Sequence, residues 1–108
     1  MTSWIDIGGV DDIPALGARV VHTAAGDIAV FRDGQDRVRA LKDRCPHKGG
    51  PLSQGIVHGE HVTCPMHSWC IHLESGEAAA PDRGCARPCP VKVEGRRVWL
   101  KVPEENSP

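Results

Sequence analysis

The chain reads CPHKGGP over residues 45–51 and CPMH over residues 64–67, with sixteen residues between His47 and Cys64. In each run a proline directly follows the cysteine. A histidine comes next, after a gap of one residue in the first run and two in the second. Thiolates and imidazoles are the side chains that soft and borderline metals prefer. The spacing therefore predicts two short loops that hold one metal centre between them.

A two-iron cluster suits this spacing, because each loop then supplies one thiolate and one imidazole. Cys45 and Cys64 would hold one iron, and His47 and His67 the other, which is the ligation that distinguishes a Rieske centre from an all-cysteine ferredoxin. Pro46 and its counterpart in the second loop fix the backbone after each cysteine, and the glycines of the first loop allow close approach to bridging sulfides. We therefore predict that these four residues bind the cofactor and ligate its metal.

A structural zinc site of the Cys2His2 type is the competing interpretation, since it uses the same four side chains. The gap of one residue between Cys45 and His47 is shorter than the usual zinc spacing of two to four. Zinc also has no need of the glycines and proline that follow. The zinc site is kept as the second interpretation.

A second C-x-H run occurs at Cys70–His72. Here Trp69, Ile71 and Leu73 alternate with polar residues, which predicts a strand with one apolar face. Cys70 and His72 would project from the other face, with no turn to fold them around a cluster. We expect the remaining candidates to be free thiols or solvated imidazoles: Cys85, Cys89, His22, His58 and His61.

Length and composition agree with one small folded domain of 108 residues, 40% hydrophobic and 25% charged. Nine prolines and 12 glycines predict many turns and little helix. No export signal or membrane-spanning stretch is apparent, so we expect a cytoplasmic protein in which metal ligation explains the cysteines better than disulfides do. The net charge of −1 argues against nucleic acid or an anionic membrane as a partner.

The hydrophobic pattern predicts short strands separated by turns, and hence an all-β fold of antiparallel sheets. The expected strands are Val20–His22, Ile28–Arg32, Val38–Leu41, His61–Thr63, Trp69–Leu73, Val91–Val93 and Val98–Val102. Asp33-Gly34 and Glu94-Gly95 are predicted hairpin turns. Asp11–Leu16 is expected to form at most one helical turn, with Pro14 near its start.

The predicted organisation is one domain over residues 1–103, with a cluster-binding part at about 44–81 and a flexible tail at 104–108. The flanking strands would pair with each other as a base below the ligand loops. Asp6, Asp11 and Asp12 make the first eighteen residues acidic, whereas the last third is basic. This pattern suggests a dipolar surface.

On these residues the sequence resembles a Rieske [2Fe–2S] protein over nearly its whole length. The resemblance implies the Rieske-type iron–sulfur fold, with a small cluster-binding subdomain whose tip carries one [2Fe–2S] cluster on Cys45, His47, Cys64 and His67. It also implies a third, proline-containing loop over the cluster, for which Ala79–Pro81 is in the right place.

Finer sequence features resemble the small subunit of assimilatory NAD(P)H nitrite reductase. They are CPHKGGPLSQGIV at residues 45–57, HSW at 67–69, SGEA at 75–78, DRGCAR at 82–87 and PVKVE at 90–94. The resemblance implies electron transfer to a large flavin- and sirohaem-bearing subunit that reduces nitrite to ammonia, or to a nitrate reductase of the same pathway. The near rival is the Rieske ferredoxin that serves aromatic-ring dioxygenases. No catalytic substrate site is expected on this chain alone.

Rieske proteins of respiratory complexes place Ser and Tyr after the second histidine ligand, where they donate hydrogen bonds to sulfur. The matching positions here hold Trp69 and Ile71, which cannot do so. Fewer donors stabilise the reduced cluster less, so we predict a midpoint toward the low end of the Rieske range of roughly −150 to +300 mV. A redox titration measures this midpoint, and a strongly positive value would contradict the prediction.

Overall fold

The computed structural model describes residues 4–23, 26–44, 51–64, 69–79 and 84–101. Across these residues the protein is nearly all β, with two short 3₁₀ turns at Val10–Asp12 and Leu52–Gln54. The strands are β1 (Trp4–Gly9), β2 (Gly17–Thr23), β3 (Gly26–Arg32), β4 (Val38–Lys42), β5 (Ile56–His58), β6 (His61–Thr63), β7 (Cys70–His72), β8 (Pro88–Cys89), β9 (Val91–Glu94) and β10 (Arg97–Lys101). No helix in this part of the chain is long and apolar enough to cross a membrane.

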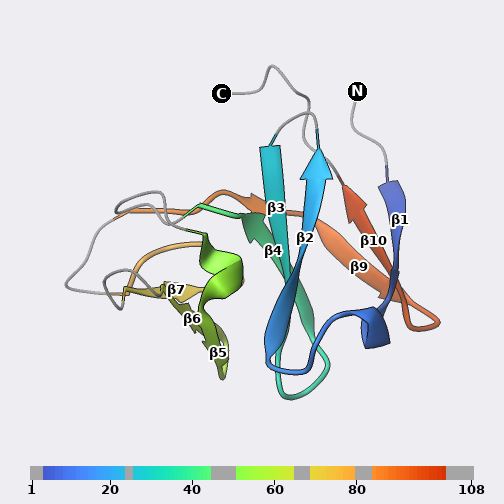
Figure 1. Cartoon of the computed structure of the whole chain (residues 1–108), viewed down its shortest axis with the longest axis horizontal. Helices are drawn as coiled ribbons and strands as arrows, with labels where there is room; N and C mark the ends of the chain where they lie inside the picture. The colour runs from blue at the N-terminus through green and yellow to red at the C-terminus, as the bar shows by residue number, and fades with distance from the viewer. Residues whose placement is uncertain (1–3, 24–25, 45–50, 65–68, 80–83, 102–108) are drawn as a thin grey trace.

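The strands form three antiparallel sheets, in the orders β1-β10-β9, β2-β3-β4-β8 and β5-β6-β7. In Figure 1 the four-stranded sheet stands in the middle, with the β5–β7 sheet on one side of it and the β1-β10-β9 sheet on the other. The all-β, antiparallel architecture predicted from the sequence is confirmed.

Strand β3 separates two hydrophobic cores because its consecutive apolar residues point to opposite faces of the sheet. Ala29 and Phe31 belong to the first core, which fills the space toward the β5–β7 sheet. Ile28 and Val30 belong to the second core, which fills the space toward β10. Over Ile28–Phe31 the strand is buried on both faces, which explains the unbroken apolar run there.

Both predicted hairpins form. In the β9–β10 turn, Gly95 and Arg96 have φ angles of 54° and 64°. This backbone matches the right-handed twist of the paired strands, and the turn lies one residue later than predicted. The β3–β4 connection is held by Asp33, whose carboxylate accepts hydrogen bonds from the backbone N–H groups of Gln35 and Arg37 at 2.8 and 2.9 Å.

Three strands were not expected from the sequence: β1, β5 and β8. Strand β8 is two residues long and pairs with β4 only through Cys89 and Pro88. Strand β1 carries an irregularity in its pairing with β10 between Asp6 and Gly9. The predicted helical turn forms as the first 3₁₀ turn, but Pro14 lies beyond its end, where its carbonyl accepts from Gly17 N–H at 3.0 Å.

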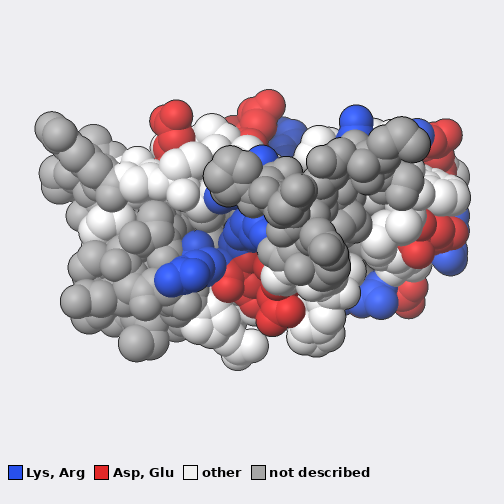
Figure 2. Space-filling view, turned by 90° about the horizontal axis from the view of Figure 1, so that it is seen from above, with Lys and Arg blue, Asp and Glu red and all other residues white. Residues whose placement is uncertain are grey.

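The suggested dipolar surface is partly neutralised, because β1 and β10 are neighbours and some of their charges pair. Arg97 Nη2 lies 2.9 Å from an Asp6 carboxylate oxygen, and Arg96 Nη2 lies 2.7 Å from one of Asp11. Figure 2 shows positive and negative side chains next to one another on the face it presents. The acidic start of the chain and the basic last third therefore neutralise each other where they meet.

Candidate metal centre

Of the four predicted ligands, the structure describes Cys64. Cys45, His47 and His67 lie outside the described residues. Cys64 follows directly after β6, its residue is 1% exposed, and its thiol is free. What can be tested is whether Cys64 and the described ends of the loops fit a cluster.

Strands β6 and β7 form a hairpin whose tip begins at Cys64 and ends at Trp69. The last pair in register is Thr63 with Cys70. Beyond it, Cys64 N–H donates to the Trp69 carbonyl at 2.7 Å, so the two ends of the second ligand loop are joined by a hydrogen bond. Trp69 packs against the first core, as predicted from the sequence. The backbone of Cys64 is thus held in place at the end of the β6–β7 hairpin.

Two hydrogen bonds between Asp43 and Ser53 join the two ends of the first ligand loop. The Ser53 N–H and hydroxyl each donate to one oxygen of the Asp43 carboxylate, both at 2.7 Å. Leu52, which precedes Ser53, is fully buried in the same core as Cys64. Both ligand loops are therefore rooted on one hydrophobic core.

Gly55 brings the segment after the first loop directly against β6. A Cβ atom at this position would lie 2.3 Å from the Thr63 carbonyl oxygen and 2.9 Å from a methyl of Val62. Thr63 immediately precedes Cys64. Only glycine permits this approach, which sets the roots of the two ligand loops side by side.

A third segment approaches the same place. Ala79 N–H donates to the Cys70 carbonyl at 2.7 Å, and Ala78 N–H donates to the Gly84 carbonyl at 2.9 Å. The predicted third loop therefore starts next to the end of the second one, while Ala80 and Pro81 lie outside the described residues.

The described residues fit a cluster of the predicted kind. A free, buried thiol stands where the tip of the β6–β7 hairpin begins, and two further loops start beside it. Thiolate is the ligand type that iron–sulfur clusters take from cysteine. The described residues themselves contain no group of three or more metal-binding side chains.

Residues 3–95 match the sequence profile of the Rieske [2Fe-2S] domain. The chain belongs to the Rieske [2Fe–2S] family. Its cofactor is a Rieske-type [2Fe–2S] cluster, and its fold is the Rieske fold. When bound, the cluster accepts and releases single electrons.

Curated relatives of this Rieske chain include larger and similarly sized proteins. It is 40% identical over 84 residues to a 4beta-methylsterol monooxygenase of Methylococcus capsulatus, covering 68% of this chain and 23% of that protein. It is 30% identical over 101 residues to the ferredoxin component of naphthalene 1,2-dioxygenase/salicylate 5-hydroxylase systems of a Ralstonia species, covering 93% and 96%. The chain spans 23% and 29% of the first two curated relatives it matches.

Two solved structures have the same fold. A chain of the complex of reduced oxygenase and oxidized ferredoxin in carbazole 1,9a-dioxygenase has a TM-score of 0.80 at 26% identity, covering 91% of this chain and 92% of that one. A putative NADH-dependent nitrite reductase small subunit from Mycobacterium tuberculosis has a TM-score of 0.84 at 21% identity, covering 96% and 98%. The second likeness concerns the fold alone.

The second C-x-H run of the Rieske chain behaves as predicted. Ile71 is fully buried, while Cys70 and His72 are half-buried on the outer face of the β5–β7 sheet. Burial raises the pKa of the Cys70 thiol. Cys85 and Cys89 are free, as predicted, although Cys89 is buried in the second core rather than placed in a loop.

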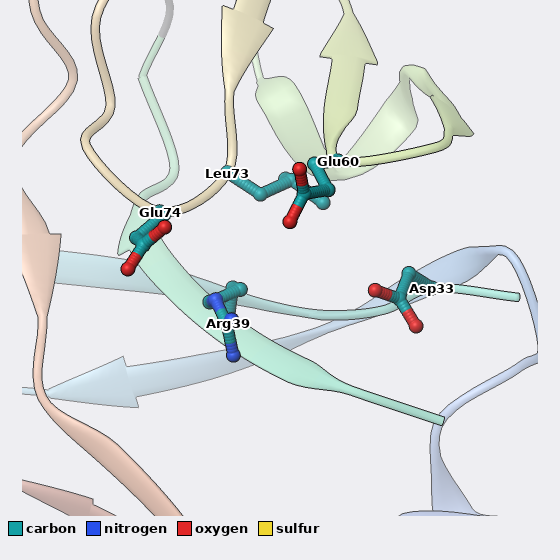
Figure 3. A pocket seen from close by; sticks show the side chains of 5 residues that line it. All are labelled: Asp33, Arg39, Glu60, Leu73 and Glu74. Atoms are coloured by element: carbon teal, nitrogen blue, oxygen red, sulfur yellow. The ribbon is translucent and has the colours of Figure 1, made fainter. Parts of the chain in front are cut away.

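A small pocket lies between the β3–β4 hairpin and the β5–β7 sheet (Figure 3). Its lining residues are Asp33, Arg39, Glu60, Leu73 and Glu74. Glu60 precedes β6 and Cys64 follows it, so the pocket lies at the end of this strand away from the ligand loop. Arg37 connects the β3–β4 hairpin to the β5–β7 sheet, because its guanidinium lies 2.8 Å from Asp33 and 3.3 Å from Glu60.

Proposed function

We propose that this Rieske protein is the small subunit of an assimilatory NAD(P)H-dependent nitrite reductase, in which electrons pass through its cluster during the reduction of nitrite to ammonia. The sequence around the ligand loops and over residues 75–94 carries this proposal, because it resembles that subunit. The partner would be the large flavin- and sirohaem-bearing subunit. A nitrate reductase of the same pathway is a further acceptor.

Cys45, His47, Cys64 and His67 are the ligands in this proposal. One thiolate and one imidazole come from each loop. The environment of Cys64 supports the assignment, since a free, buried thiol on a rigid hairpin is what a ligand position requires. The single domain over residues 1–103 is part of the same proposal.

The structure gives a physical role to the SGEA run and to the Gly84–Ala86 segment that follows it. Gly76 has a φ of 77°, and a Cβ there would lie 1.8 Å from the Ala86 carbonyl oxygen. Ala86 N–H donates to the Gly76 carbonyl at 2.7 Å, and Glu77 forms a bridge with Cys85. These contacts hold the two ends of the third loop together beside the second ligand loop. The SGEA run therefore helps to position the third loop.

A Rieske ferredoxin of an aromatic-ring oxygenase is the second candidate. It is favoured by the 30% identity to the dioxygenase ferredoxin component, which extends over 96% of that protein. The two candidates differ in their redox partner and share the same cluster.

Reconstitution separates them. The purified holoprotein is added to a nitrite reductase large subunit, and nitrite-dependent NAD(P)H oxidation is followed. In parallel it is added to an oxygenase and its reductase, with product formation as the readout. We expect activity in the first system, absent with Cys64→Ser and retained with Cys70→Ser. Turnover only in the oxygenase system would favour the ferredoxin and overturn the proposal.

A further inference from the structure

Three histidines form a row across the outer face of the β5–β7 sheet, outside the predicted cluster site. His58 is paired in register with His61, and His61 with His72. Their neighbours on the inner face are Val57, Val62 and Ile71, which are buried in the first core. The packing below therefore fixes the strands that carry the three imidazoles.

The rings of His61 and His72 are the closer pair. Their centroids lie 4.3 Å apart with the planes tilted by 51°, so the two rings are in contact without being stacked face to face. The rings of His58 and His61 lie 5.9 Å apart and are nearly parallel, at 13°. In addition, His58 Nε2 lies 2.6 Å from the Thr63 hydroxyl, which occupies one of its two nitrogens.

We infer that His61 and His72 form a second metal site, separate from the iron–sulfur cluster, for a divalent transition cation of the Zn²⁺, Ni²⁺ or Cu²⁺ class. Imidazole nitrogen is a preferred ligand of these ions. A tetrahedral ion about 2.0–2.1 Å from each nitrogen needs ring centres about 5 Å apart, which a small side-chain rotation provides. The described residues hold no group of three or more metal-binding side chains, so the proposed site has two protein ligands and leaves the other coordination positions to solvent.

The protonation state of His61 suits a ligand. Burial lowers the pKa of His61, and the nearby imidazoles of His72 and His58 lower it further, against an opposing effect of the Glu60 carboxylate. The lowered pKa favours the neutral ring, whose lone pair is available to a metal. Within the described part of the chain, no group forms a hydrogen bond with the imidazole of His61 or of His72.

The ion would join β6 and β7 across the hairpin whose tip runs from Cys64 to Trp69. Binding to the folded protein alone stabilises it by mass action. A metal at His61 and His72 would therefore tighten the support of the second ligand loop without contacting the cluster.

The test uses the holoprotein with Cys70→Ser and Cys85→Ser, so that neither thiol competes for the added metal. Zn²⁺ is titrated by calorimetry, and visible absorption confirms that the iron cluster stays in place. We expect one Zn²⁺ per chain. At a concentration ten times the dissociation constant, the unfolding midpoint should rise by about 5–10 °C.

Single substitutions identify the site. His61→Gln and His72→Gln should each weaken Zn²⁺ binding at least tenfold. His58→Gln, in the same row, and His22→Gln, an exposed histidine beside Asp27, should change it less than threefold. The inference is overturned if Zn²⁺ does not bind, if binding survives His61→Gln with His72→Gln, or if His58→Gln weakens it as much as His72→Gln.

Discussion

Single residues decide how the ligand loops are held, and Gly76 is the strictest of them. Its φ of 77° disfavours any side chain, and its Cβ would lie 1.8 Å from a backbone oxygen of Ala86. Neither the angle nor the contact can relax without moving the segment that leads into the third loop. The glycine of the SGEA run is therefore required for steric reasons.

We expect Gly76→Ala to lower the free energy of unfolding by about 3 kcal/mol, from backbone strain and overpacking together. Urea denaturation of the holoprotein measures the change. Gly34→Ala is the matched control, since its Cβ would meet only a Leu16 methyl at 3.5 Å. Equal stability of the two variants would contradict this reading of Gly76.

Asp33 is the one buried charged residue among those described. Burial raises the pKa of its carboxyl, but hydrogen bonds from the backbone of Arg37 and Gln35 and from the Arg37 side chain outweigh burial, so the pKa lies below its ordinary value. A carboxyl with a lowered pKa in the folded state stabilises the protein above its unfolded pKa, and this stabilisation is lost as the pH falls through the folded value.

Asp33→Asn should therefore cost about 1–3 kcal/mol at pH 7, because an amide is a weaker acceptor and leaves Arg37 with only one of its two carboxylate partners, Glu60. The stability difference between the wild type and this variant should shrink as the pH falls below about 4. Urea titrations at pH 7 and pH 3 check it. A difference that is independent of pH would show that the charge of Asp33 has no part in stability.

At the scale of elements, β3 packs into one core with each of its faces. Adjacent residues of β3 therefore stabilise different parts of the molecule. Phe31 faces the core that contains Cys64, and Val30 faces the core under β10. Replacing Phe31 should loosen the core that supports the ligand loops. Replacing Val30 should leave that core intact.

We predict that Phe31→Ala costs about 3–5 kcal/mol and that the variant loses its cluster faster than the wild type. Val30→Ala should destabilise the fold by a smaller amount and keep the wild-type rate of cluster loss. Visible absorption after addition of an iron chelator gives the rates. Equal rates for the two variants would contradict the division of the cores.

Sequence patterns predicted the strands with strong apolar content, β2, β3, β4, β6, β7, β9 and β10, to within a few residues. They did not predict β8, because Pro88 and Cys89 become a strand only through pairing with β4. The histidine row could not be predicted either, because it depends on which residues of β5, β6 and β7 are paired with one another. His61 was expected to be solvated, but it is half-buried against His72.

At the scale of the whole molecule, the ligand spacing predicted the family and the cofactor, and both are confirmed. The metal ligands themselves stay a prediction, supported by the environment of Cys64. The partner also stays a prediction, because the fold is common to a putative nitrite reductase small subunit and to a dioxygenase ferredoxin. Partner choice depends on surface residues, which follow no periodic pattern.

The central claim is that Cys64, with Cys45, His47 and His67, holds a Rieske cluster and that the nearby Cys70 does not. Electron paramagnetic resonance of the reduced protein tests it most directly, with Cys64→Ser and Cys70→Ser as a matched pair. We predict the rhombic Rieske signal in the wild type and in Cys70→Ser, and its absence in Cys64→Ser. A colourless, silent wild type, as for a zinc protein, or a signal that is lost with Cys70→Ser and kept with Cys64→Ser, would contradict the account.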